Sequence, residues 1–465
     1  MFARTSSASL CVALALCLMG CPGPDEGEDT GVDAPGSMED AGVDAPRADV
    51  GPGADAGRET DCSGTGCDFV ELELTAESTC ARRENGAVIC WGYAQDGQLG
   101  DGRMRHAPGC VVPSGMAALD CSAVPVAVDL AVPALELEGG AHSMCAVTGT
   151  DRTHLCWGER GFSIDDSLAT DRFAPVLEPT FDGATLEDAQ SHGCWIDGDS
   201  TAAVHCIGSN GAGQLGNGSR MVSILPVVPT RESDDTPITG ALEIVAGTYG
   251  GNTCVRTATE VLCWGTNDRG QLGDGVMDHP DVEDDCGSDA TASDCSLRAV
   301  VVDIDATMVV ELAQGFDHTC AHMSDGTLWC WGGNAYGQLG TGNNDASFVP
   351  VQVPGVAGVA SLSVNGYTTC VLGIDGRVQC WGQANLGQVG DGAMDHDLIT
   401  CSVDCQLSPV FVDGLDDAVA LGTGFSHSCA ITETNAIVCW GDNNRFQLGD
   451  SDREPHRSPT PVMGL

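Results

Sequence analysis

The chain contains no lysine. All 19 of its basic residues are arginine, they face 67 acidic residues, and the formal net charge is −48. The absence of lysine excludes a phosphate-loop lysine and a Schiff-base lysine, and the shortage of positive charge excludes a basic track along nucleic acid. So large an excess of negative charge favours solubility and repulsion from anionic surfaces. We therefore expect no nucleic-acid partner.

Long apolar runs are also scarce. The stretch from Leu10 to Met19 is too short to span a bilayer and has the size of a secretory signal. It leads into Leu-Met-Gly-Cys, ending at Cys21, which resembles the lipobox of bacterial lipoproteins. The resemblance implies a signal peptide over 1–21, lipidation of Cys21 and, because Pro22 rather than Asp follows, the outer membrane. An ordinary signal peptide cleaved nearby is the alternative.

Residues 22–61 have no composition from which a core could form. They are almost entirely Asp, Glu, Gly, Ala, Pro and Val, and Gly-Val-Asp-Ala-Pro occurs twice, at Gly31 and at Gly42. Such a segment buries too little apolar surface to become ordered, and its like charges keep it extended. We predict a disordered acidic linker that holds a domain over 62–465 away from a membrane. The expected location is the outer membrane or cell surface, reached through the general export pathway.

Cysteine, in contrast, is abundant. Of 25 cysteines, Cys11 and Cys17 leave with the signal peptide and Cys21 would carry lipid, which leaves an even 22. So dense and even a set is typical of a disulfide framework in an oxidising compartment. Cys62 and Cys67 would form one pair. The other predicted pairs are Cys80/Cys90, Cys110/Cys121, Cys145/Cys156, Cys194/Cys206, Cys254/Cys263, Cys286/Cys295, Cys320/Cys330, Cys370/Cys380, Cys401/Cys405 and Cys429/Cys439.

Many of these cysteines belong to a repeat. Cys-Trp-Gly occurs six times, and Cys-Ile-Gly at Cys206 is a seventh, degenerate copy. Midway between Cys320 and Cys330, Ser-Asp-Gly predicts a hairpin whose three-residue loop has Gly326 in a left-handed conformation. In the last copy Asn435 takes this position, which Asn also tolerates. With one strand before each hairpin and a Pro-Val strand after it, four strands form each unit of roughly 50 residues. We therefore predict an all-β, seven-bladed β-propeller.

The ends of the repeat region suggest how the ring closes. The first unit begins at Phe69 with no Pro-Val strand before it, and the chain ends on a Pro-Val strand at 458–463 with no unit after it. We expect this C-terminal strand to complete the first blade and close the ring, because closure removes exposed sheet edges.

The full repeat resembles a known family. Its units carry Gly-x-x-His-[Ser/Thr]-x-Cys or a variant, then Asp-Gly-x-x-x-Cys-Trp-Gly, then Gly-Gln-Leu-Gly. This pattern resembles the regulator of chromosome condensation (RCC1) repeat, in a secreted, disulfide-rich bacterial lipoprotein version. The resemblance covers the chain after the linker and implies a seven-bladed propeller used for binding. It also implies two alternatives: guanine-nucleotide exchange on a small GTPase, against which export and disulfides argue, and inhibition of an enzyme outside the cell.

Three units carry an insertion directly after Gly-Gln-Leu/Val-Gly. Each insertion opens with Gly-Asp-Gly-x-Met-x-His and then holds its own cysteine pair. Equivalent positions in a propeller lie on one face, so units one, four and six should present three loops there, where repeat folds commonly bind. One alternative is a duplicated loop kept for local turn reasons, and another is a copper site of thioether and imidazole ligands. The candidate binding residues are Met104, His106, Met277, His279, Met394 and His396.

Other motifs indicate structure rather than chemistry. No nucleophile or acid–base pair recurs, so we expect no enzyme activity, no catalytic residue, no metal and no other cofactor. We interpret His318 and His427 as structural hydrogen-bonding residues and the repeated Trp as blade-to-blade packing. The acidic stretch 281–289 could hold calcium but lacks regular ligand spacing. The prediction is a monomeric, lipid-anchored surface protein whose propeller binds a protein or a glycan on the extracellular side.

Overall fold

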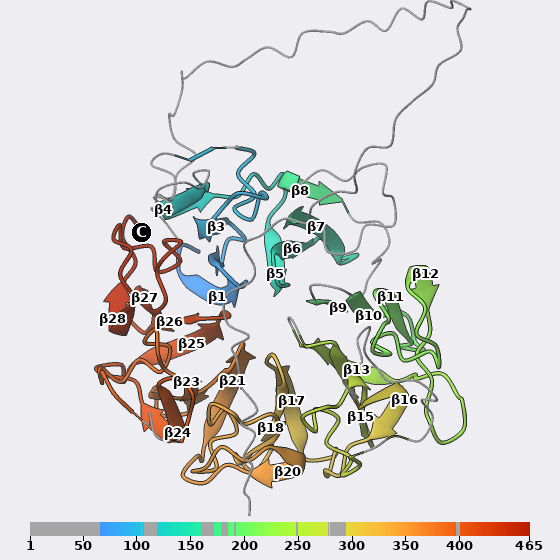
Figure 1. Cartoon of the computed structure of the whole chain (residues 1–465). Helices are drawn as coiled ribbons and strands as arrows, with labels where there is room; N and C mark the ends of the chain where they lie inside the picture. Colours follow the sequence, from blue (N-terminus) through green and yellow to red (C-terminus); the bar gives the residue numbers. More distant parts are fainter. Residues whose placement is uncertain are drawn as a thin grey trace, which may run out of the picture. The chain divides into compact units, whose positions relative to one another are not determined.

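The computed structural model describes residues 66–103, 105–106, 119–159, 172–177, 185–189, 192–247, 250–277, 279, 294–396 and 400–465. Within these ranges the chain forms seven four-stranded antiparallel sheets, one for each predicted unit (Figure 1). The seven-bladed propeller predicted from the repeat is therefore confirmed. These ranges contain no helix, and hence none that could cross a membrane. The predicted signal peptide, linker and lipidated Cys21 lie outside the described residues.

Each blade uses four consecutive strands. The first strands are β1 (Phe69–Leu74), β5 (Ala134–Gly139), β9 (Thr185–Ala189), β13 (Ala241–Ala246), β17 (Val309–Gln314), β21 (Val359–Asn365) and β25 (Ala418–Thr423). The second strands are β2 (Ser78–Arg83), β6 (Ser143–Thr148), β10 (His192–Ile196), β14 (Asn252–Thr257), β18 (His318–Met323), β22 (Thr368–Gly373) and β26 (His427–Thr432). The third strands are β3 (Val88–Tyr93), β7 (Thr153–Gly158), β11 (Val204–Gly208), β15 (Val261–Thr266), β19 (Leu328–Gly332), β23 (Val378–Gln383) and β27 (Ile437–Gly441). The fourth strands are β4 (Cys121–Ala127), β8 (Arg172–Leu177), β12 (Ser223–Val227), β16 (Cys295–Val301), β20 (Ser347–Gln352), β24 (Cys405–Phe411) and β28 (His456–Pro461).

The ring closes differently from the expectation. The C-terminal strand β28 pairs with β27 in the seventh blade, and β1 to β4 complete the first blade without it. The Pro-Val strand of unit one does exist, as β4, but the insertion displaces it along the chain. Closure comes from packing of β1 against β25 and β26, and from contacts such as the backbone N–H of Phe69 donating to Oδ1 of Asn435 at 2.7 Å.

The hairpins have the predicted geometry. Gly326 has φ of 79° and Asn435 has φ of 61°, so both adopt the left-handed conformation that the loop requires. Cys320 and Cys330 lie directly opposite each other in the β18–β19 ladder and are bonded. Among the described residues, the same cross-hairpin bond joins Cys80–Cys90, Cys145–Cys156, Cys194–Cys206, Cys254–Cys263, Cys370–Cys380 and Cys429–Cys439.

The Trp of Cys-Trp-Gly joins neighbouring blades. Trp331 is fully buried, and its Nε1–H donates to the carbonyl oxygen of Gln271, in the Gly-Gln-Leu-Gly segment of the preceding blade, at 2.9 Å. The same bond recurs for all six tryptophans of the motif, including Trp91, which reaches Gln447 across the ring closure. A Cβ at Gly340 would lie 2.7 Å from Nε1 of Trp381, so the absence of a side chain on the last glycine of Gly-Gln-Leu-Gly leaves room for the indole of the next blade. The structure therefore confirms that the repeated Trp packs one blade against the next.

Buried histidines make a second connection between blades. Nε2 of His318 lies 2.9 Å from Oγ1 of Thr369, and Nε2 of His427 lies 2.8 Å from Oγ1 of Thr79 in the next blade around the ring. Burial lowers the pKa of both imidazoles to about 3, so they are neutral hydrogen-bonding groups at physiological pH. Their role is structural, as the sequence indicated.

Candidate functional site

One end of the propeller gathers the connections that vary most. In an antiparallel four-stranded blade, the first and third connections lie at one end and the second connection at the other. We call the end with the first and third connections the loop face. The insertions of blades one, four and six are third connections, so all three belong to the loop face.

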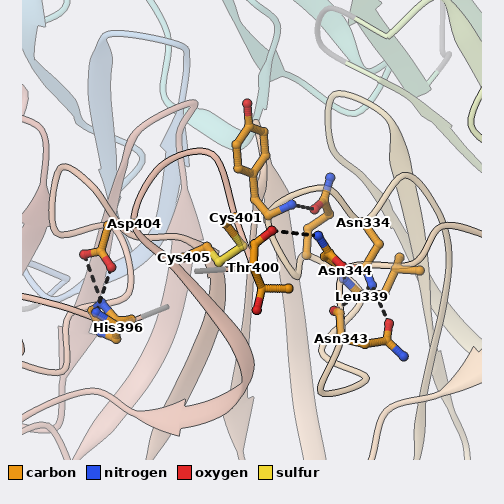
Figure 2. Close-up of a disulfide and its surroundings, with 11 residues drawn as sticks. Asn334, Leu339, Asn343, Asn344, His396, Thr400, Cys401, Asp404 and Cys405 are labelled. Carbon is orange, nitrogen blue, oxygen red and sulfur yellow. Dashed lines mark hydrogen bonds and ion pairs between the residues drawn. A yellow bond between two sulfur atoms is a disulfide. The ribbon is translucent and has the colours of Figure 1, made fainter. Parts of the chain in front are cut away.

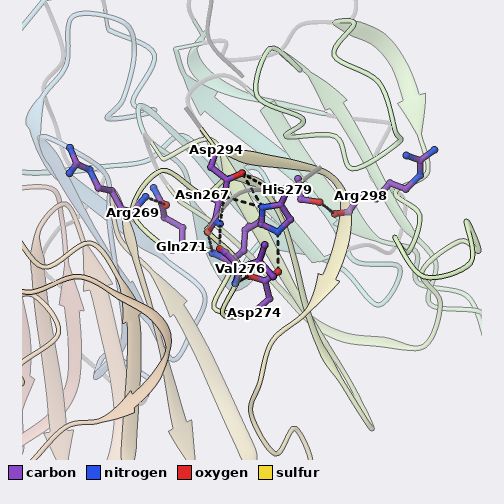
Figure 3. Close-up of polar contacts among 10 residues, drawn as sticks. Asn267, Arg269, Gln271, Asp274, Val276, His279, Asp294 and Arg298 are labelled. Carbon is purple, nitrogen blue, oxygen red and sulfur yellow. Dashed lines mark hydrogen bonds and ion pairs between the residues drawn. The ribbon is translucent and has the colours of Figure 1, made fainter. Parts of the chain in front are cut away.

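The insertion of blade four is held by a histidine between two carboxylates (Figure 3). Nε2 of His279 lies 3.0 Å from Asp274 and Nδ1 lies 2.9 Å from Asp294, while the backbone N–H of His279 donates to Asp294 at 3.0 Å. The imidazole is only 3% exposed. Asp274 belongs to Gly-Asp-Gly and Asp294 directly precedes Cys295, so the histidine ties the start of the insertion to its end.

The same Asp-His-Asp clamp recurs in the other two insertions. In blade one, His106 bridges Asp101 at 3.0 Å and Asp120 at 2.8 Å. In blade six, His396 bridges Asp391 at 3.0 Å and Asp404 at 3.1 Å. All three imidazole side chains are buried.

The carboxylates of each clamp raise the pKa of the imidazole that they hold. Burial by itself lowers the pKa of His279, but hydrogen bonds and charge from Asp274 and Asp294 outweigh it and raise the pKa to about 10. The pKa values of His106 and His396 are raised by the same balance of causes. At neutral pH His279 is thus an imidazolium between two carboxylates, and in all three clamps the two carboxylates favour the charged form of the histidine, which suits a structural tie.

In the motifs of blades four and six, the exposed methionine and the buried imidazole have different surroundings. Met277 and Met394 are 71% and 72% exposed, whereas His279 and His396 are buried in their clamps. Met104 lies outside the described residues, as does the acidic stretch 281–289. Both ring nitrogens of every clamped histidine face carboxylates, so a copper site formed by these imidazoles would first have to break the clamps. The exposed methionines remain candidates for contact with a partner.

Disulfides add a further tie to the insertions. In blade six, Cys401 is bonded to Cys405, as predicted, beside the His396 clamp (Figure 2). The side chain of Asn344, in the third connection of blade five, donates to the backbone oxygen of Thr400 at 3.0 Å. This contact links neighbouring loops. Cys67, Cys121 and Cys295 are also disulfide-bonded, and their predicted partners Cys62, Cys110 and Cys286 lie outside the described residues.

Next to these loops, the loop face carries an aromatic cluster. Phe316, Tyr367 and Phe425 come from the first connections of blades five, six and seven, and Tyr336 comes from the third connection of blade five. The Tyr367 ring lies 5.0 Å from Phe316, 4.8 Å from Tyr336 and 6.4 Å from Phe425, centre to centre. All four rings are half-buried. The cluster therefore offers a contiguous aromatic surface across three blades.

Carboxylates adjoin the aromatic cluster. Asp317 follows Phe316 and accepts a hydrogen bond from the side chain of Gln338 at 2.9 Å. Asp442 accepts a 3.4 Å hydrogen bond from the hydroxyl of Ser426, the residue after Phe425. Burial raises the pKa of both aspartates, so these carboxylates are poorly solvated. Aromatic faces beside such carboxylates form a surface suited to cationic groups.

Sequence reasoning missed this cluster, although the chain contains a signal for it. Only four tyrosines are present, and Tyr336 and Tyr367 both fall in connections of the loop face. Gly-Phe also precedes His318 and His427 by the same spacing. These residues meet only because the connections of three neighbouring blades converge on one face. The spacing of the repeats alone does not show which side chains of these connections touch.

The opposite end of the ring has a different surface. A β-bulge near the start of β13 and of β17 leaves Leu242 and Val310 unpaired, 58% and 48% exposed. These two side chains provide a matched control for any test of the loop face.

Comparison with known proteins supports the repeat type. The family description "Regulator of chromosome condensation (RCC1) repeat" matches residues 325–372, and a second description of the same repeat matches 309–338 and 418–447. The chain is 26% identical over 393 residues to the ultraviolet-B receptor UVR8 of Arabidopsis thaliana, covering 82% of this chain and 79% of UVR8. It is 26% identical over 395 residues to the E3 ubiquitin-protein ligase HERC2 of Homo sapiens, covering 82% of this chain but only 7% of HERC2.

Solved structures support the fold. Prp20p from Saccharomyces cerevisiae superposes with a TM-score of 0.63 at 16% identity, over 85% of this chain and 88% of Prp20p. Human WBSCR16 superposes with a TM-score of 0.61 at 20% identity, over 81% of this chain and 95% of WBSCR16. The chain thus carries repeats similar to those of RCC1, folded as a seven-bladed β-propeller.

Proposed function

We propose that this protein is a lipid-anchored surface protein that binds a protein partner through the loop face of its propeller. The observation that carries the proposal is the aromatic cluster of Phe316, Tyr336, Tyr367 and Phe425, which lies on the same face as the three clamped insertions. Clusters of aromatic side chains held by a rigid scaffold are the usual energetic centre of protein interfaces. The proposal includes no catalysis.

The clamps supply the rigidity that such an interface needs. A loop whose two ends are tied together loses less conformational entropy when it binds, which strengthens binding. A histidine between two carboxylates ties the ends of each insertion, and the insertion of blade six also has the bond between Cys401 and Cys405. We infer that these loops surround the partner while the aromatic cluster contacts its centre.

The charge of the chain favours a basic region on the partner. Asp317 and Asp442 adjoin the aromatic cluster, and the net charge of −48 would speed the approach of a positively charged surface. The partner would therefore present arginine or lysine side chains toward the cluster. An exported enzyme with such a surface would make the protein an inhibitor, which is a special case of the same binding.

The relatives agree with protein binding in general. The structure of Prp20p was described together with its binding properties to Gsp1p and histones. At 16% identity this similarity supports the fold and transfers no partner. Nucleotide exchange on a small GTPase is not proposed, because the many disulfides of the described residues indicate an oxidising compartment.

The test is capture of a partner by the full chain from extracts of the cell surface and medium, followed by cross-linking to map the contact. The variant Phe316→Ala/Tyr367→Ala/Phe425→Ala should weaken binding of the captured protein at least tenfold. The control Leu242→Ser/Val310→Ser, on the opposite end, should leave binding unchanged. Equal binding by both variants, or cross-links confined to the opposite end, would refute the loop-face proposal. A glycan array probed with the same variants would show whether a glycan is bound instead.

The anchor requires a separate test. Cells expressing the full chain would be labelled with palmitate, and labelling should be lost in Cys21→Ala while Cys17→Ala still matures. Fractionation should then find the wild-type protein with the outer membrane. Secretion of an unlabelled wild-type protein would show that residues 1–21 are an ordinary signal peptide.

A further inference from the structure

A cluster with the spacing of metal ligands lies in blade seven, in the turn that precedes β28. Asp450, Asp452 and His456 each offer one ligand atom, and these three atoms lie within 4.8 Å of one another. Nε2 of His456 is 2.9 Å from Oδ2 of Asp450 and 3.2 Å from Oδ1 of Asp452. Among the described residues, no other group of three or more acidic, histidine or cysteine side chains has this spacing.

Blade seven differs from the Asp-His-Asp clamps in one respect. In each clamp the two carboxylates face different ring nitrogens, so one imidazolium satisfies both. In blade seven, Nδ1 of His456 lies 2.9 Å from the hydroxyl of Thr460, and both carboxylates therefore face Nε2. Only Oδ1 of Asp452 lies in hydrogen-bonding geometry with Nε2, and Oδ2 of Asp450 has no hydrogen-bond partner.

That unpaired oxygen is buried. The side chain of Asp450 is 5% exposed. Its Oδ2 lies close enough to Nε2 of His456 for an ion pair, but the two atoms do not have the geometry of a hydrogen bond. A buried carboxylate oxygen to which no hydrogen points is unfavourable unless a cation compensates it. The two carboxylates also carry one more negative charge than a protonated histidine could neutralise. The geometry therefore calls for a cation between the three side chains.

The surrounding residues hold the three ligands in place. The side chain of Asn443 donates to Oδ1 of Asp450 at 2.7 Å and to the backbone oxygen of Asp452 at 3.0 Å. Thr460, on β28, orients the imidazole through Nδ1. Hydrogen bonds of this kind to the second oxygen of a carboxylate and the second nitrogen of a histidine are typical around bound metals.

We propose that Asp450, Asp452 and His456 bind a divalent cation of the zinc class. An imidazole nitrogen with two carboxylate oxygens suits Zn²⁺, and the partial exposure of Asp452 and His456 leaves room for water as a further ligand. Because His456 belongs to the C-terminal strand β28 and Asp450 to the preceding turn, the ion would fasten the last strand of the ring. The site is distinct from the three clamps, in which each of the two ring nitrogens contacts a different carboxylate.

The test uses the full chain and Co²⁺ as a spectroscopic probe, with Ca²⁺ in excess to occupy sites made of oxygen ligands alone. We expect a saturable visible absorption at one equivalent of Co²⁺, reversed by Zn²⁺. His456→Gln and the exposed-ligand variant Asp452→Asn should weaken binding at least tenfold. His396→Gln, which removes a clamped imidazole in blade six, should leave the absorption intact.

Thermal melting provides a second measurement that shows whether each variant is folded. Zn²⁺ should raise the melting temperature of the wild type and of His396→Gln but not that of His456→Gln. The proposal is overturned if the wild type shows no saturable absorption, if His456→Gln binds Co²⁺ as tightly as the wild type, or if His396→Gln loses the signal to the same extent.

Discussion

Replacing His279 by glutamine should destabilise the protein, and the loss should depend on pH. Glutamine is neutral and cannot reach both Asp274 and Asp294, so two charge-assisted hydrogen bonds disappear and two buried carboxylates lose their counter-charge. Removal of one partner from a buried ion pair typically lowers the free energy of unfolding by about 3–5 kcal/mol. We expect a loss in this range at pH 6.

The pH dependence follows from the pKa of His279. The ordinary pKa of histidine applies in the unfolded chain, while the folded value is raised to about 10. Stabilisation by a raised pKa is complete below the unfolded value and is lost as the pH rises through the folded value. Between the two, the free energy of unfolding falls by at most about 1.4 kcal/mol per pH unit. The difference between wild type and His279→Gln should therefore shrink by about 3 kcal/mol between pH 6.5 and pH 9.

Urea unfolding with the disulfides intact, followed by tryptophan fluorescence at pH 6 and pH 9, measures this difference. Because groups outside the clamp titrate equally in both proteins, the subtraction isolates the clamp formed by His279 and its two carboxylates. The matched control is His205→Gln, which removes a histidine paired with Asp197 at 2.9 Å in a partly exposed position and should cost less than about 1 kcal/mol. A difference for His279→Gln that is the same at both pH values, or one no larger than that of the control, would refute the account of the clamp.

Two further predictions concern the scaffold. Gly340→Ala should lower the free energy of unfolding by about 2 kcal/mol or more, because Gly340 has φ of 69° and its added Cβ would lie 2.7 Å from Trp381. The control is Gly355→Ala, which also has a positive φ but open space around it. It should lower the free energy of unfolding less in the same urea titration. A double change of Cys320 and Cys330 to serine removes their disulfide and should lower the free energy of unfolding by about 3 kcal/mol by the chain-entropy estimate. Thermal melting of this variant and of the wild type measures the difference. An unchanged melting temperature would show that the disulfide does not stabilise the hairpin.

The blade architecture could be predicted because its determinants are local. Cys320 and Cys330 are ten residues apart, a glycine at the midpoint sets the turn, and the hairpin places them opposite each other whatever the rest of the chain does. The packing role of Trp also followed from its recurrence in six of the seven units. Ring closure was predicted wrongly because the insertion in unit one separates β3 from β4, so that the first blade appeared to lack its fourth strand.

The sequence by itself determined the number of blades, their hairpins and the cysteine pairs within them, since each rests on contacts between residues about ten positions apart. Only the tertiary structure decided which acidic residues hold His106, His279 and His396, because each histidine meets a second aspartate across the whole length of its insertion. The tertiary structure likewise decided that aromatic residues of three blades meet on one face, because the ring brings together side chains that the sequence separates by whole repeats.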